Sequence, residues 1–192
     1  MTFAPPSTRK LKSGFTLIEL LITMAVLGVL MAIALPSLST FIVSNRLSSN
    51  VNAFLGFVNY ARSEAIARNQ PVLICAKNNA SNACVSSQYW NEYETQMFVD
   101  VDGSDSWTTG DILLKTLPAM DTTGNETAFT RQTTSTFIKF GALGLASTTH
   151  RLDIHAVSSD SAYETKYGRT LCISKPGRIR VITYTLGTCS AF

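Results

Sequence analysis

The sequence contains none of the short motifs that mark common catalytic sites. No G-x-S-x-G nucleophile elbow, phosphate-binding glycine loop or H-E-x-x-H zinc motif occurs in its 192 residues. His150 and His155 are an odd number of positions apart, so on a strand they would point to opposite faces. The four cysteines form no C-x-x-C pair and are not spaced with these histidines as a zinc ligand set would be. We therefore expect no enzyme, no metal site and no cofactor.

Charge of one sign is missing from two stretches. No lysine or arginine occurs between Glu92 and Asp111, and no aspartate or glutamate follows Glu164. The first 14 residues carry three of the 16 basic side chains and no acid, so without them the formal net charge of +3 falls to zero. The basic segment after Glu164 is therefore a local feature of a neutral protein, and its electrostatics need an explanation.

Charge is also nearly absent from an apolar run close to the N-terminus. Between Phe15 and Leu35 the only ionisable side chain is Glu19, and about 20 apolar residues can cross a bilayer as a helix. The only charged residues before the run are basic. This asymmetry predicts a cytoplasmic N-terminus and translocation of the chain that follows the run. A cleaved secretory signal is an alternative, but the run is longer than usual for one. A plain anchor is another, in which Glu19 would cost about 2.5 to 3.5 kcal/mol of insertion energy without a function.

The start of this run resembles the N-terminus of type IV pilins and pseudopilins: basic residues, then Gly14-Phe15-Thr16-Leu17-Ile18-Glu19, then an unbroken apolar stretch. The resemblance implies that a prepilin peptidase cuts between Gly14 and Phe15 and that the new Phe15 amine is N-methylated. It also implies that Glu19 neutralises the terminal amine of a neighbouring subunit in a filament. The physics agrees, because a carboxylate and an ammonium attract strongly at low dielectric and each is costly alone.

The same resemblance implies where the protein is found. We expect a single pass through the inner membrane with a periplasmic domain before assembly, and then a place in the pilus at the cell surface. The expected protein partners are the prepilin peptidase and other major and minor pilins.

Two different hydrophobic patterns follow the apolar run, the first up to about Arg68 and the second from Pro71 onward. Beyond Pro36, apolar residues recur every three or four positions to about Arg68, which predicts an amphipathic helix with one buried face. The apolar positions are Leu38, Phe41, Ile42, Val51, Phe54, Leu55, Val58, Ala65 and Ile66. From Pro71 onward, about seven short runs rich in β-branched and aromatic residues alternate with polar turns. The polar tracts at 77–83 and 120–135 are expected to be loops.

We therefore predict an α+β fold in which a long N-terminal helix, part transmembrane and part amphipathic, packs on a C-terminal antiparallel sheet or sandwich. The expected boundaries are a cleaved leader at 1–14, a membrane and filament-core helix at 15–36, an amphipathic helix at 37–70 and a β-rich domain at 71–192. This order resembles the FimT and GspH group of minor pilins and pseudopilins. The stretches that carry the likeness are "ARSEAIARNQPVLIC", "FVDVDG" and "GRTLCISKPGRIRV".

All four cysteines follow the apolar run, in the part expected to reach an oxidising compartment. An even number of cysteines there predicts disulfides. Four cysteines allow three pairings, and we expect Cys75–Cys84 and Cys172–Cys189 because each closes a short local loop.

The basic C-terminal segment contains "KPGRIR", Lys175 to Arg180. Pro176 and Gly177 are expected at the two central positions of a turn between two strands. Arg178 and Arg180 would then project from one face of the second strand, about 6.5 to 7 Å apart. That distance is close to the spacing of phosphates along a nucleic-acid strand, and guanidinium groups bind phosphate oxygens with paired hydrogen bonds.

FimT-like proteins of naturally competent bacteria carry a G-R-x-R pattern here, which Gly177, Arg178 and Arg180 match. The resemblance implies non-specific contacts to the backbone of double-stranded DNA during uptake for natural transformation. The supporting residues would be Lys175, Arg169 and Lys166.

Three alternatives remain open for these basic residues. They could protect an edge strand from aggregation, or pair with the acidic 92–111 segment of this subunit or its neighbour. The chain could also be a GspH-like pseudopilin of a type II secretion system with a structural role.

The acidic segment itself has Asp100, Asp102 and Asp111 at positions one, three and twelve of an EF-hand loop. Asp105 stands where such a loop needs glycine, so we expect a solvated turn there.

Overall fold

The structure is a computed structural model that describes residues 14–78, 80–120, 128–131, 135–156, 166–184 and 189, with the backbone alone at 34–37, 39 and 40. The chain divides into two compact units, 1–41 and 42–192. The elements in order are α1 (Leu17–Arg68), β1 (Val72–Lys77), β2 (Glu94–Val99), β3 (Ile112–Leu117), β4 (Ala128–Arg131), β5 (Phe137–Phe140), β6 (His150–His155), β7 (Arg169–Ile173) and β8 (Ile179–Thr183).

Helix α1 has recognisable signals at both of its ends. The Glu19 amide donates a hydrogen bond to Thr16 Oγ1 at 3.3 Å, so Thr16 caps the helix and Glu19 takes the third position of a Thr-x-x-Glu capping box. At the other end Asn69 has a φ of 54° and the Gln70 amide donates to the carbonyl of Ala65. This left-handed cap ends the helix before Pro71, as the sequence predicts.

The first unit exposes nearly all of its apolar side chains. Phe15 is 82% exposed, and the leucine, isoleucine and valine residues from Leu17 to Ile33 are at least half exposed. Within the described residues, no helix combines the length and the hydropathy needed to cross a membrane.

In the second unit, one face of α1 is buried against the sheets. Four of the predicted apolar positions are buried (Val51, Phe54, Val58 and Ala65), and Leu55 is half-buried. Leu38, Phe41, Ile42 and Ile66 were expected on this face and are exposed instead. Leu47, Phe57 and Ala61 complete the buried stripe. Leu47 is the first residue of α1 that joins the main core, so the buried stripe begins later than the apolar spacing in the sequence.

The first sheet has the strand order β3-β2-β1-β5, and all of its pairs are antiparallel. Strand β1, one of its two central strands, is buried on both faces. Val72, Ile74 and Ala76 pack with α1 in the main core, whereas Leu73 and Cys75 join Phe98 in a second cluster on the far face. Trp107 and Phe137 cover that second cluster. The alternation follows from the two-residue period of a strand.

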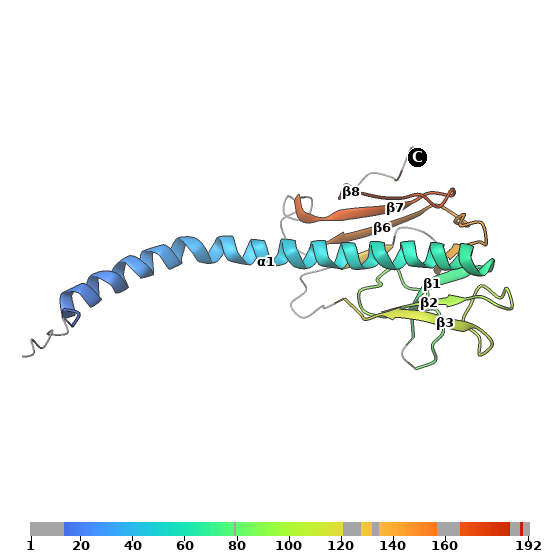
Figure 1. The fold of residues 1–192 in the computed structure, drawn as a ribbon, viewed down its shortest axis with the longest axis horizontal. Helices are drawn as coiled ribbons and strands as arrows, with labels where there is room; N and C mark the ends of the chain where they lie inside the picture. Colours follow the sequence, from blue (N-terminus) through green and yellow to red (C-terminus); the bar gives the residue numbers. More distant parts are fainter. Residues whose placement is uncertain are drawn as a thin grey trace, which may run out of the picture. The chain divides into compact units, whose positions relative to one another are not determined.

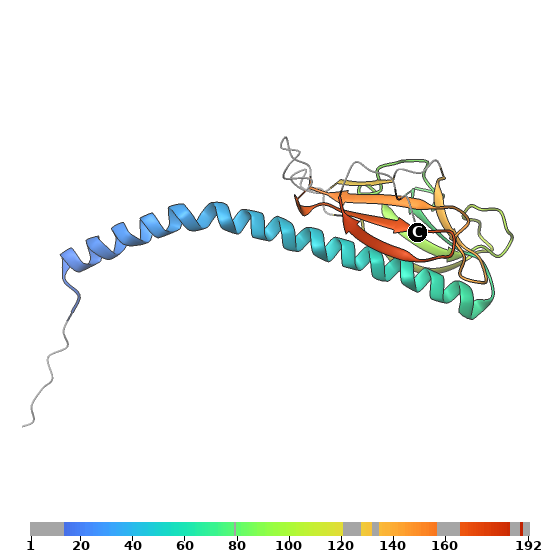
Figure 2. The same ribbon diagram turned by 90° about the horizontal axis from the view of Figure 1, so that it is seen from above.

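The second sheet has the order β4-β6-β7-β8 and is also antiparallel. Leu152, Ile154, Leu171 and Ile173 point from it into the same main core as α1. Figure 1 shows the C-terminal half of α1 with β1 to β3 on one side and β6 to β8 on the other. Figure 2 shows the orange and red strands of the second sheet running alongside this half of the helix. The predicted α+β class is confirmed.

Strand β4 lies inside the 120–135 tract that we expected to be a loop. Phe129 and Arg131 are buried while Ala128 and Thr130 are partly exposed, so the four residues alternate as an edge strand does. Phe129 packs with its ring centroid 4.7 Å from that of Phe54 and 5.9 Å from that of Trp90. Only one aromatic residue marks this strand, and polar residues flank it, so its period is not visible in the sequence.

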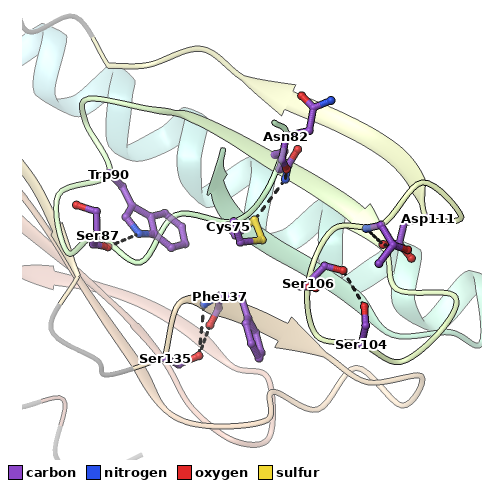
Figure 3. Close-up of a disulfide and its surroundings, with 12 residues drawn as sticks. Cys75, Asn82, Ser87, Trp90, Ser104, Ser106, Asp111, Ser135 and Phe137 are labelled. Atoms are coloured by element: carbon purple, nitrogen blue, oxygen red, sulfur yellow. Dashed lines mark hydrogen bonds between the residues drawn. A yellow bond between two sulfur atoms is a disulfide. The ribbon is translucent and has the colours of Figure 1, made fainter. Parts of the chain in front are cut away.

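The structure forms both of the expected disulfides, Cys75–Cys84 and Cys172–Cys189. The first joins β1 to the following loop, which Gln96 also holds by donating to the carbonyl of Asn82 at 2.6 Å. Figure 3 shows Cys75 in this region, with Trp90 donating to the carbonyl of Ser87 and Ser104 to that of Ser106. Local hydrogen bonds and a crosslink therefore order loops that have little apolar sequence.

Candidate functional site

The predicted basic turn connects β7 and β8, but it is displaced by one residue from the expected position. Gly177 donates its amide to the carbonyl of Ser174 at 2.8 Å, and Ser174 donates its amide to the carbonyl of Arg178 at 3.0 Å. Lys175 and Pro176 are thus the central residues, and Gly177 follows them with a φ of 76°. This is the three-residue hairpin loop in which a turn is followed by a left-handed glycine.

Gly177 is buried and has a packing role. A Cβ atom at this position would lie far inside contact distance of the Gly144 carbonyl oxygen, and 2.8 Å from Arg62 Nε. Arg62, on α1, donates from Nε to the carbonyl of Gly144 at 3.0 Å and from Nη2 to that of Pro176 at 3.3 Å. The glycine of the G-R-x-R pattern therefore allows the turn to pack closely against the helix. Gly177 itself is buried and is not exposed to a ligand.

Arg178 and Arg180 are both exposed and fall on the same side of the second sheet. The register places Arg180 opposite Cys172, and Cys172 opposite Arg151 of β6. These three residues form one cross-strand row on the face away from the core. Arg151 lies 3.0 Å from the buried carboxylate of Asp153, which also accepts a hydrogen bond from Thr170. Arg151 was not among the predicted site residues, because only the strand register brings it into this row.

The other two predicted residues lie elsewhere. Arg169 has the same alternation as Leu171 and Ile173, so it points to the opposite face of the sheet from Arg180. Its Nη1 donates to the carbonyls of Tyr167 and Gly168 at 3.2 and 2.7 Å. Lys166 lies before β7, at the end away from the turn, with its ammonium 5.1 Å from the Tyr167 ring centroid. Exposed Lys175, Arg178 and Arg180 are therefore brought together, and Arg169 and Lys166 are not.

The acidic segment forms ion pairs with lysines of the first sheet. Glu94 pairs with Lys77 at 3.1 Å, and Asp100 and Asp105 both pair with Lys139. Burial disfavours the Lys139 ammonium, but its hydrogen bonds to Asp105 and Asp100 outweigh that effect, so the pKa of Lys139 lies above its ordinary value. The alternative in which this segment neutralises the basic turn has no support from these pairs.

Carboxylate oxygens of Asp100, Asp102 and Asp111 come within 4.8 Å of one another. Asp100 and Asp102 accept hydrogen bonds from the Ser104 amide at 3.0 Å, and Asp111 accepts from the amides of Val101 and Thr108. The hydrogen bonds from Ser104 hold the pKa of Asp102 below its usual range. These contacts are those of a loop that uses its aspartates to satisfy its own backbone.

Sequence reasoning gave no role to a buried pair of basic side chains. Arg131 is 4% exposed, with its guanidinium carbon 5.1 Å from the Trp90 ring centroid. His150 is 1% exposed and shares a hydrogen bond of 3.1 Å with Thr148 through Nε2. Burial lowers the pKa of Arg131 to about 10. Burial, and then the charge of Arg131, lower the pKa of His150 to about 4. His150 is therefore neutral at physiological pH.

The processing and assembly residues of the prediction lie in the other unit. Gly14 and Phe15 precede α1, and Glu19 is exposed in its first turn. Glu19 has a local role there, because an acidic side chain near a helix N-terminus is stabilising.

Two family models match the chain. The first, described as type II transport protein GspH, covers residues 50–177, and the second, a prokaryotic N-terminal methylation motif, covers residues 9–35. None of the curated protein sequences matches the chain.

The chain is similar to two solved pilin-like structures. One is the type IV minor pilin FimU of Pseudomonas aeruginosa, at 21% identity and a TM-score of 0.51, over 72% of this chain and 89% of that one. The other is the minor pseudopilin EpsH of the Vibrio cholerae type 2 secretion system, at 10% identity and a TM-score of 0.46, over 72% and 97% of the two chains.

Proposed function

This chain belongs to the GspH family, and we propose that it is a minor pilin of a type IV pilus that binds double-stranded DNA without sequence preference. The N-terminal methylation motif at residues 9–35 supports processing between Gly14 and Phe15 and assembly through Glu19. In this proposal the protein resides in the inner membrane before assembly. It is then incorporated into the pilus, where it binds DNA for uptake in natural transformation.

The observation that carries the DNA part is the exposed basic turn. Lys175, Arg178 and Arg180 lie at one end of the β7–β8 hairpin on exposed positions. No carboxylate side chain occurs anywhere in residues 165–192, so this segment contributes only positive side-chain charge. Phosphate contacts of this kind supply non-specific affinity that weakens steeply with salt.

The test is a DNA titration with the full-length protein in detergent, since the N-terminal unit exposes its apolar run. A labelled duplex of about 20 base pairs is titrated at several salt concentrations with the wild type and with Arg178→Ala/Arg180→Ala. Each phosphate contact contributes about 0.9 to the slope of log affinity against log salt, so the double variant is expected to reduce that slope by about 2.

The control variant is Lys77→Ala/Lys115→Ala, which removes the same charge from the first sheet. It should bind DNA as the wild type does. Equal losses in both variants would mean that net charge matters and the turn does not, and the proposal would be abandoned.

The second candidate function is that of a type II secretion pseudopilin, which the description of the family model favours. It predicts that the wild type does not bind the duplex even at low salt. In that case the arginines would protect the edge of the second sheet, where β8 is the last strand among the described residues.

A further inference from the structure

Two turns of the same construction lie side by side at one end of the β domain. In the β5–β6 connection, Gly144 donates to the carbonyl of Gly141 at 2.8 Å and Gly141 donates to that of Leu145 at 2.9 Å. The β7–β8 turn has the same two hydrogen bonds, from Gly177 to Ser174 and from Ser174 to Arg178. Gly144 and Gly177 occupy equivalent places, with φ values of 71° and 76°. We call residues 141–145 and 174–178 together the twin-turn tip.

The two turns are fastened to each other and to α1. The Ala146 amide donates to the carbonyl of Lys175 at 2.9 Å, and Arg62 donates to the carbonyls of Gly144 and Pro176. A side chain on Gly144 would collide with Ile66, whose Cδ1 lies 2.7 Å from the position of the missing Cβ. The tip is therefore one preorganised surface, built from two turns that are far apart in the sequence and held by Arg62 of α1.

This surface is both apolar and basic. Leu143 is 79% exposed, the highest value of any large apolar residue that the structure describes in the second unit, and Leu145 is 50% exposed. Leu143 and Pro176 hold the same position in their two turns and are both exposed. Lys175 and Arg178 flank Pro176, and residues 141–149 contain no acid.

We propose that the twin-turn tip binds DNA as a unit, with Lys175 and Arg178 on phosphates and Leu143 inserted as an apolar wedge at a base step in the minor groove. This rests on the proposed function and extends it from backbone contact to deformation of the duplex. Proteins that bind the minor groove commonly insert leucine or proline between base steps while cationic side chains hold the flanking backbone. A rigid turn meets this requirement, because a wedge on a flexible loop would lose ordering entropy on insertion.

The charge of the tip favours DNA as the occupant over another protein. Lysine is depleted at protein interfaces, although arginine is enriched there, and most charged residues are depleted in the interface core. Protein–DNA interfaces are instead strongly positive. An exposed leucine together with exposed lysine and arginine on one preorganised surface is therefore better matched by a polyanion that also offers an apolar base stack.

The experiment uses the full-length protein in detergent and a duplex of about 20 base pairs with 2-aminopurine in place of adenine at several steps. Leu143→Ser is compared with the wild type, and Leu113→Ser, which changes a leucine with 50% exposure on β3, is the matched control. Unstacking by a wedge raises 2-aminopurine fluorescence. We expect this rise with the wild type and the control, and not with Leu143→Ser. The affinity of Leu143→Ser should fall about tenfold, the order of effect of losing one leucine contact, with its salt slope unchanged.

The outcomes separate this inference from the proposed function. If Leu143→Ser binds and perturbs the duplex as the wild type does, while Arg178→Ala/Arg180→Ala lowers the salt slope, the wedge is wrong and DNA binding stands. If the wild type does not bind the duplex at low salt, both fail. If Leu143→Ser keeps DNA binding and fluorescence but loses binding to vesicles of anionic phospholipid, or loses self-association, the leucine serves a membrane or a second copy, and the inference is also overturned.

Discussion

Replacing Gly177 by alanine should destabilise the protein through two separable effects. A non-glycine residue in the left-handed region costs about 1 to 2 kcal/mol, and Gly177 has a φ of 76°. The added methyl group also meets the Gly144 carbonyl and Arg62 Nε, so the hydrogen bond from Arg62 to Gly144 must lengthen or break. A hydrogen bond to a charged group contributes about 1.5 to 3 kcal/mol. We therefore expect a loss of about 2.5 to 5 kcal/mol in the free energy of unfolding, measured by urea denaturation with the disulfides intact.

Two other glycines provide controls that separate the backbone contribution from the contribution of the contacts. Gly103 has a φ of 73° but nothing within 4 Å of an added Cβ, so Gly103→Ala should show the backbone term alone, about 1 to 2 kcal/mol. Gly141 has an open neighbourhood, with its nearest atom 3.9 Å away, and Gly141→Ala should be nearly neutral. If Gly177→Ala costs no more than Gly103→Ala, the contact with Gly144 and Arg62 is not a constraint, and the reasoning about the turn is refuted.

Two further predictions concern the core. The free energy of unfolding should fall by up to about 3 kcal/mol between pH 6.5 and pH 4, because the unfolded chain protonates His150 below about 6.5 whereas the folded protein does so only near 4. Urea denaturation at several pH values measures this loss. The prediction would be contradicted if the free energy of unfolding of His150→Gln depended on pH as strongly as that of the wild type. Phe129→Ala should cost about 3 to 5 kcal/mol, since the ring is 1% exposed against Phe54 and Trp90. Ile182→Ala, at a position 37% exposed on β8, should cost less than about 1 kcal/mol, and equal losses would show that β4 is not part of the core.

The sequence predicted the elements whose signals are local. The end of α1 near Arg68 and seven of the eight strands follow from turn-forming residues and hydrophobic period. The disulfides follow from the short loops they close. β4 was missed because its stability comes from Phe54 and Trp90, which are distant in the sequence. Leu38, Phe41 and Ile42 were assigned to the buried face because period alone does not say where a core begins.

The positive charge of the site could be predicted from the sequence, but the contacts that hold its residues in place could not. "KPGRIR" indicated an exposed basic hairpin, but the proximity of Arg169 in the sequence suggested a contribution that strand alternation rules out. Arg62 received no role from the sequence. Its contacts to Gly144 and Pro176 depend on how the helix packs beside two turns, and no pattern within the sequence contains that information.

The bonds of Arg62 have a mechanical consequence. If DNA is held by Lys175 or Arg178 as proposed, a pull on it would act first on the β7–β8 turn, and an edge hairpin alone would open one hydrogen bond at a time. Because Arg62 joins the carbonyls of Pro176 and Gly144 to α1, and the amide of Ala146 joins the two turns, these bonds must stretch together. Tension is thereby distributed over the helix and both sheets, and rupture requires a larger force than opening the hairpin in sequence.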